Sequence, residues 1–189
     1  MMTLGNIFGT FFSYSYKVYG SSSGSHQPIS EQTLTWAASI GSGIINGLSR
    51  IVLGGVVDRV GFKTLFMILM GIQLVNSLVC YWAAYVPAIY FMCVMFNYAA
   101  LGGLFAIFPV AVTNVFGLEI GPKIYVWVIL GSFFSSCINL LETTVLIDAI
   151  GFAAIFYVNS VLQLLCLVVT YFYEEKLDVE NLRKYNALK

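Results

Sequence analysis

The chain has 189 residues, of which 59% are hydrophobic and only 10% are charged, whereas an average soluble domain carries about 25% charged residues. Its mean hydropathy of +0.87 leaves too few polar side chains to cover a water-soluble globule. Nine basic and nine acidic residues cancel, so the net charge favours neither a nucleic acid nor an acidic substrate as partner. The composition therefore predicts an integral membrane protein.

Six apolar runs follow one another along the chain, and each is expected to form one membrane-crossing helix, since a crossing takes about 20 apolar residues. The runs cover about residues 1–19, 33–57, 64–85, 88–112, 124–146 and 152–172. A β-barrel is disfavoured, because its strands would alternate with period two over about ten residues. The predicted fold is an all-α six-helix transmembrane domain over residues 1–172, followed by a charged tail over residues 173–189.

The basic residues predict the orientation of these helices, because cytosolic loops carry an excess of Lys and Arg. With six crossings both termini lie on one side, and that side has seven basic residues: Arg59, Lys63, Lys123, Lys176, Arg183, Lys184 and Lys189. The opposite side has only Lys17, while Arg50 falls inside the second crossing. Both termini are therefore expected in the cytosol, or on the equivalent side of an organelle membrane.

Small residues spaced four apart let membrane helices approach closely. Such pairs are Gly5 with Gly9 and Gly43 with Gly47, and the fourth run contains Gly102 and Gly103. We expect close helix packing at these positions. The tyrosines near the end of the first run are expected in an interfacial belt: Tyr14, Tyr16 and Tyr19.

A loop motif between the second and third runs resembles one found in a known family. Residues 54–63 fit G-x-x-x-D-R-x-G-x-K through Gly54, Asp58, Arg59, Gly61 and Lys63. This resembles the loop motif of the major facilitator superfamily, in the copy that lies between helices 8 and 9. The resemblance implies that the chain is the carboxy-terminal six-helix half of a twelve-helix fold.

Two further stretches resemble the oxalate:formate antiporter and monocarboxylate transporter branch of that superfamily. Residues 46–50 resemble its helix 8, and residues 102–109 with 116–117 resemble its helix 10 and the following loop. The resemblance implies secondary active transport of a small solute by alternating access.

The loop motif has a physical interpretation of its own. Gly61 permits a tight turn, Asp58 can complement the positive amino terminus of a neighbouring helix, and the basic residues hold the loop at the headgroups. The motif could be a charge cluster that only fixes topology. The resemblance favours a conformational latch, because in relatives this loop braces against the other half of the transporter.

Arg50 is the most informative single residue. It precedes Asp58 by eight residues, which places it ~12 Å inside the cytosolic edge. A central arginine costs about 2.5–3.5 kcal/mol to insert, so it should face a water-filled cavity or a partner. The resemblance implies that it binds a substrate carboxylate, for which the guanidinium fork is suited. The alternative is a structural arginine bonded to helix carbonyls or reaching the cytosol.

The fifth run contains no Lys or Arg, although oxalate:formate antiporters carry a lysine there. Lys123 lies just before the first residue of the run, which is too shallow to match that lysine. Recognition of a dicarboxylate by two cations is therefore disfavoured. A monocarboxylate or an uncharged solute fits better.

Glu142 is the second charged residue inside a crossing, and its depth differs from that of Arg50 by ~15 Å, too far for a direct ion pair. It is a candidate for proton coupling, because acids within the membrane often belong to proton relays. The alternative, which we favour, is a carboxyl near the outer interface that is neutral or hydrated.

Transport of a small organic anion such as a monocarboxylate is the function that these features predict. The alternative is a non-transporting structural subunit derived from a half-transporter. An enzyme is disfavoured, because the sequence has no nucleophile–base pair, and no metal or cofactor is expected. Because the first crossing begins at Met1, the chain is expected to need a missing amino-terminal half, a second copy or a host membrane complex to cover Arg50.

Overall fold

The computed structural model describes residues 1–22 and 27–173, and within them the chain forms helices and no strands. The elements are α1 (Met2–Ser21), α2 (Glu31–Ala38), the π-helix η1 (Ser39–Ile45), α3 (Asn46–Val60), α4 (Phe62–Ala83), α5 (Pro87–Leu141), the π-helix η2 (Glu142–Leu146) and α6 (Ile147–Phe172). The predicted all-helical class is confirmed. The predicted tail lies outside the described residues from position 174 onward.

Local sequence signals set several helix ends. Ser30 caps α2, where its hydroxyl accepts a 3.2 Å hydrogen bond from the backbone N–H of Thr33. Gly61 separates α3 from α4 with φ +80, a left-handed conformation that favours glycine. Pro87 stands at the first position of α5, where its missing N–H costs nothing.

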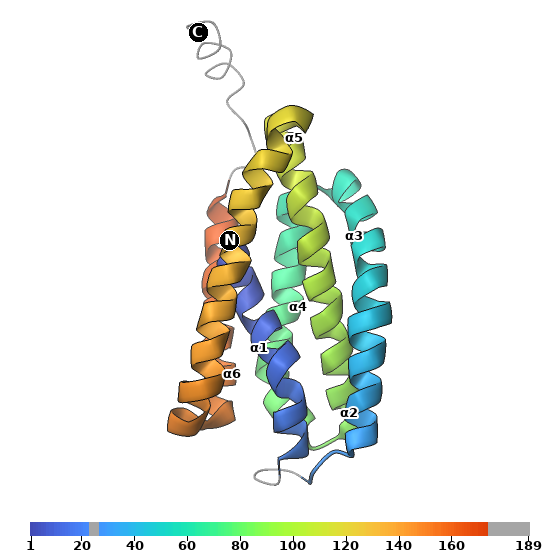
Figure 1. Cartoon of the computed structure of the whole chain (residues 1–189), viewed down its shortest axis with the longest axis vertical. Helices are drawn as coiled ribbons and strands as arrows, with labels where there is room; N and C mark the ends of the chain where they lie inside the picture. Colours follow the sequence, from blue (N-terminus) through green and yellow to red (C-terminus); the bar gives the residue numbers. More distant parts are fainter. Residues whose placement is uncertain (23–26, 174–189) are drawn as a thin grey trace, which may run out of the picture.

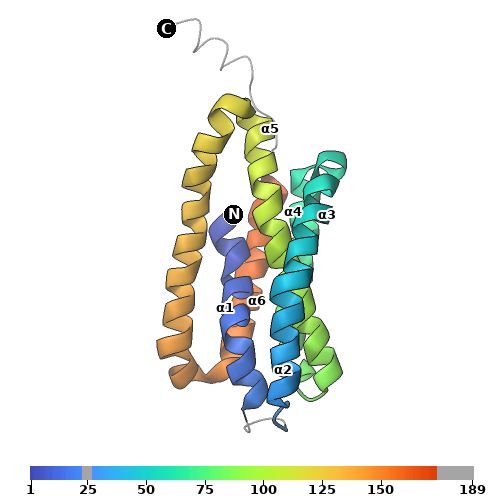
Figure 2. The ribbon, with the colours of Figure 1, turned by 45° about the vertical axis from the view of Figure 1, so that its right-hand side comes forward.

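Two more glycines interrupt the long helical run that follows Pro87. Gly117 has φ +78 within α5, and Gly151 has φ +77 within α6. The chain reverses direction near each of them (Figure 2). The break expected between the predicted helices over residues 88–112 and 124–146 is thus narrower than predicted, because helix resumes directly after Gly117.

By length and composition, three helical runs of the described chain could cross a membrane: Glu31–Val60, Phe62–Ala83 and Pro87–Phe172. The last has 86 residues, far more than the roughly 20 of one crossing, and it folds back on itself. The first predicted crossing, α1, is not among them. Its partial burial gives a reason, because a helix that packs against other helices can carry polar residues on its covered side.

α1 lies between α2 and the part of α5 that follows Gly117 (Figure 2). Twelve of its 20 residues are buried, whereas Val57 is the only buried residue of α3. The α3–α4 turn, the bend within α5 and the end of α6 gather at one end of the bundle (Figure 1). The α1–α2 connection and the α4–α5 turn lie at the other.

The aromatic residues of α1 form the centre of a core cluster. Phe12 lies edge-on to Tyr90 of α5 and Phe156 of α6, with ring centroids 5.8 and 6.0 Å apart. Tyr16 and Tyr19 are 3% and 2% exposed. The predicted interfacial belt is therefore wrong for these two tyrosines, whose hydroxyls donate to backbone carbonyls inside the protein.

Close glycine contacts occur at some of the expected positions. A Cβ atom on Gly102 would collide with the Ser49 hydroxyl and the Asn46 carbonyl, so this glycine lets α5 lie directly against α3. Gly5 and Gly9 likewise lie against α4 and α5. Gly43 and Gly47 do not: a Cβ atom on either would meet nothing within 4 Å. That pair has no close neighbour in its own bundle, and close packing at these two positions stays a prediction.

Candidate functional site

Arg50 lies on α3 and is exposed at the surface of the bundle. Its Nε atom donates a 3.0 Å hydrogen bond to Oδ1 of Asn46, one turn earlier on the same helix. Its Cζ atom lies 5.4 Å from the ring centroid of Phe105 on α5, a cation–π distance. Asn46 in turn donates from Nδ2 to the Tyr98 carbonyl oxygen at 3.3 Å, which ties this arrangement to α5.

These partners of Arg50 are all electrically neutral. Within the described part of the chain no carboxylate forms an ion pair with the guanidinium, and Nε is its only hydrogen-bonding atom. The two terminal NH2 groups of the fork are the atoms that bind a carboxylate bidentately. Arg50 therefore presents a positive charge beside an aromatic ring without a carboxylate partner among the described residues, and no hydrogen bond from it to a helix carbonyl is found there.

The loop motif contains one contact that the sequence did not indicate. Nζ of Lys63 donates a 2.6 Å hydrogen bond to the Tyr171 carbonyl oxygen and lies 5.7 Å from the Tyr171 ring centroid. The last carbonyls of a helix lack intrahelical donors, so Lys63 caps the end of α6. Asp58 and Arg59 are exposed. Gly54 faces Ala106 of α5 at ordinary contact distance.

Glu142 is enclosed by protein, with an exposed fraction of 2%. Its Oε1 atom accepts a 2.9 Å hydrogen bond from Nδ2 of Asn159 on α6, while Oε2 has no partner in the described chain. Protein therefore surrounds this carboxyl, while its depth within the membrane and its protonation stay predictions.

Glu142 belongs to a set of buried polar side chains on α1, α4, α5 and α6 that each have at least one unpaired atom. The others are Asn6, Gln73, Asn97, Asn139, Asn159 and Gln163. The sequence analysis singled out none of the six as a functional residue. A signal was present in the last helix, where Asn159, Ser160 and Gln163 interrupt an apolar run with helical spacing.

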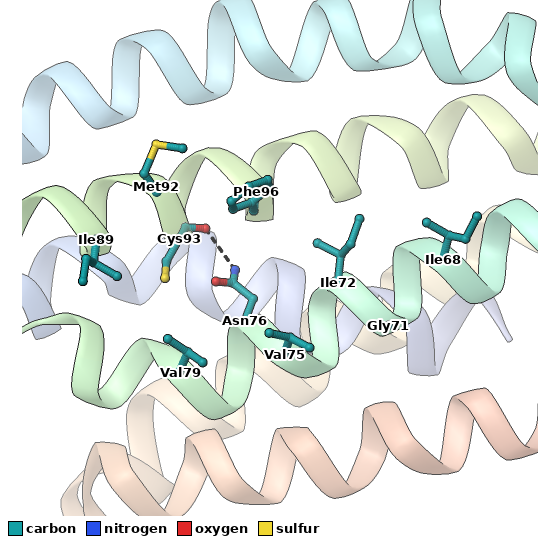
Figure 3. A pocket seen from close by; sticks show the side chains of 10 residues that line it. All are labelled: Ile68, Gly71, Ile72, Val75, Asn76, Val79, Ile89, Met92, Cys93 and Phe96. Carbon is teal, nitrogen blue, oxygen red and sulfur yellow. Dashed lines mark hydrogen bonds between the residues drawn. The ribbon is translucent and has the colours of Figure 1, made fainter.

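Two cavities of similar size differ in character. One, of about 560 Å³ between α4 and α5, is lined almost wholly by apolar side chains (Figure 3). Its single amide, Asn76, donates from Nδ2 to the Cys93 carbonyl oxygen at 2.9 Å, so no free polar group is offered. The other, of about 600 Å³ between α1 and the later part of α5, includes Ser15, Asn139, Thr143 and Asp148 in its lining. Only the second can accommodate a polar ligand.

Comparison with known proteins assigns the family. The sequence profile described as Major Facilitator Superfamily matches residues 1–188. No curated protein and no solved structure matches the chain. Apolar helices long enough to cross a bilayer accord with this family of integral membrane proteins, whose members are in general transporters rather than enzymes. The chain therefore belongs to the Major Facilitator Superfamily of small-solute transporters.

Proposed function

We propose that the protein carries out secondary active transport of a small organic anion, such as a monocarboxylate, by alternating access. One observation supports this most directly: Arg50 has no carboxylate partner among the described residues and lies beside Phe105 on an uncovered face of α3. An unpaired guanidinium at this depth is costly unless it serves an anion or a water-filled cavity. The resemblance to the oxalate:formate antiporter and monocarboxylate transporter branch points to the same substrate class.

A monocarboxylate fits the candidate site better than a dicarboxylate, because the site contains one cationic side chain, that of Arg50. Lys123 follows the bend of α5, six residues after Gly117. A dicarboxylate would need a second cation near Arg50 in this half. In this proposal Glu142 belongs to the site of the coupling ion.

The proposed topology has six crossings with both termini cytosolic. The straight segments would be separated at the α1–α2 connection, Gly61, the α4–α5 turn, Gly117 and Gly151. Arg59 and Lys63 flank the α3–α4 turn, Lys123 follows the bend of α5, and the turn and the bend gather at one end of the bundle. That charge asymmetry supports the cytosolic assignment of this end.

Alternating access requires a second six-helix unit against the face that carries Arg50, because such transporters rock two halves around a midplane site. The partner would be an amino-terminal half, a second copy or a host complex. The outward-facing Gly43 and Gly47 would let its helices approach closely, and the exposed Asp58 and Arg59 would form the latch.

A reconstitution experiment tests the proposed function. The protein encoded by the uninterrupted gene is inserted into liposomes, and uptake of radiolabelled monocarboxylates, dicarboxylates and neutral analogues is measured with and without a pH gradient. Saturable monocarboxylate uptake is expected. The rival function, a structural subunit without transport, would give no uptake of any solute, together with retention of the protein in a larger membrane complex.

A further inference from the structure

The region between η2 and α6 contains more hydrogen-bond acceptors than donors. Nδ2 of Asn159 donates to Glu142 Oε1 at 2.9 Å and to the Ile155 carbonyl oxygen at 3.1 Å, which uses both of its hydrogens. Three oxygens then lack a donor among the described residues: Oε2 of Glu142, Oδ1 of Asn159 and Oδ1 of Asn139. Rotating the Asn159 amide would not help, because the bond to Glu142 would be lost.

These three side chains are close together in the fold. Asn139 and Glu142 stand three residues apart on one helical run, a spacing that puts side chains on the same face. Asn159 reaches Glu142 from α6. Their exposed fractions are 6%, 2% and 0% for Asn139, Glu142 and Asn159, so bulk water does not satisfy the unpaired oxygens.

Unpaired acceptors in a low-dielectric interior are costly, and a carboxylate there needs a compensating positive charge. A proton on Glu142 would supply one donor and leave at least one amide oxygen unpaired. A small cation bound among these side chains would provide a partner for all three oxygens. Carboxylate and amide oxygens are hard donors that suit hard cations, and one carboxylate balances one unit of charge, so a monovalent ion fits better than a divalent one.

The surrounding structure provides a route to this cluster. Asn139 lines the cavity of about 600 Å³ beside α1, and Asp148 is also part of its lining. Among the described residues no Lys or Arg lines that cavity, so the Asp148 carboxylate there favours cations. Lys17 of α1 instead lines a separate depression with Glu31. Glu142 also begins the π-helical turn η2, a local irregularity that is frequent at functional sites.

We propose that Asn139, Glu142 and Asn159 bind Na⁺, and that Na⁺ rather than a proton is the coupling ion at Glu142. The second statement rests on the proposed transport function, whereas binding itself does not. Na⁺ would hold the end of α5 against α6, because its ligands come from both sides of Gly151.

Equilibrium binding of ²²Na⁺ to the purified full chain in lipid nanodiscs tests the site, with K⁺ or choline keeping the ionic strength constant. Saturable binding of one Na⁺ per chain is expected, with affinity about tenfold or more weaker in Glu142→Gln and in Asn139→Ala. Gln73→Leu is the matched control, because it removes a buried, unpaired amide on α4 and should leave binding unchanged. Size-exclusion chromatography verifies that each variant is folded.

No saturable binding by the wild type, or equal binding by Glu142→Gln, would overturn the proposal. Displacement of bound ²²Na⁺ by K⁺ at equal concentration would also contradict it. Arg50→Ala separates this proposal from the transport function, since it should retain full ²²Na⁺ binding while losing anion uptake. Na⁺ binding without any anion uptake in the wild type would refute the transport proposal alone.

Discussion

The Nε atom of Arg50 and the side-chain oxygen of Asn46 are joined by a 3.0 Å hydrogen bond along the exposed face of α3. Asn46 fixes the guanidinium without neutralising it, because an amide oxygen carries no formal charge. The same asparagine donates to the Tyr98 carbonyl oxygen on α5, so the position of Arg50 is linked to the close contact between α3 and α5.

Replacing Asn46 by Asp should therefore impair anion uptake while leaving Arg50 in place. The new carboxylate would form an ion pair with the guanidinium and compete with the substrate, so we expect KM to rise about tenfold or more. Asn46→Ala is the control: it removes the hydrogen bonds without adding a charge, and its effect on KM should be smaller. Equal KM values for the two variants, measured by uptake into liposomes, would show that charge neutralisation at Arg50 does not matter.

Gly102→Ala should destabilise the bundle, because the added Cβ would collide with the Ser49 hydroxyl and the Asn46 carbonyl. We expect a loss of about 1–3 kcal/mol in the free energy of unfolding. Gly71→Ala on α4 is the matched control, since its Cβ would meet nothing within 4 Å and alanine favours helix. Unfolding titrations in mixed micelles measure both. A Gly102→Ala variant as stable as Gly71→Ala would contradict the close contact between α3 and α5.

Lys63→Met should loosen the end of α6. The substitution removes the donor to the Tyr171 carbonyl oxygen and a positive charge at a helix carboxy terminus, a loss of about 0.3–1 kcal/mol. Hydrogen exchange should accelerate at residues 170–172. Arg59→Met removes an exposed charge from the same loop and should leave exchange at α6 unchanged. Equal exchange rates in the two variants would show that Lys63 does not cap the end of α6.

Single-cysteine labelling tests the six-crossing topology in a background whose four native cysteines are replaced by serine. Arg59→Cys and Glu119→Cys should react with an impermeant maleimide from the cytosolic side. Ser30→Cys and Val86→Cys should react only from the opposite side, because the α1–α2 connection and the α4–α5 turn lie at the other end of the bundle. Reaction of Glu119→Cys and Ser30→Cys from the same side would refute the topology.

The helical class could be predicted because apolar runs of bilayer length have few alternatives. The turn at Gly61 could also be predicted, since the motif places a glycine between charged residues at the end of an apolar run. The narrow bend at Gly117 could not: residues 113–123 lie between two predicted helices, but residues 118–123 continue as helix. Composition does not show whether a short stretch between two glycines resumes helix immediately.

The side on which a residue lies was harder to predict than its secondary structure. Tyr16 and Tyr19 suit a membrane interface by residue type, yet α1 packs against other helices and buries them. Gly43 and Gly47 have the spacing of a packing pair but face outward. The Glu142–Asn159 contact joins residues 17 apart across the reversal at Gly151, and no local pattern indicates such a pairing. These features depend on which helices lie next to one another in the fold. The local pattern of a single sequence does not show that arrangement.

Anion uptake by Arg50 variants in liposomes tests the central claim most directly. Wild-type protein, Arg50→Ala, Arg50→Lys and the control Lys17→Ala are compared for initial rates of monocarboxylate uptake at equal protein density. The account predicts that Arg50→Ala abolishes uptake, that Arg50→Lys restores little because the bidentate fork is lost, and that Lys17→Ala transports at the wild-type rate. Uptake by Arg50→Ala at the wild-type rate would show that Arg50 does not bind the substrate.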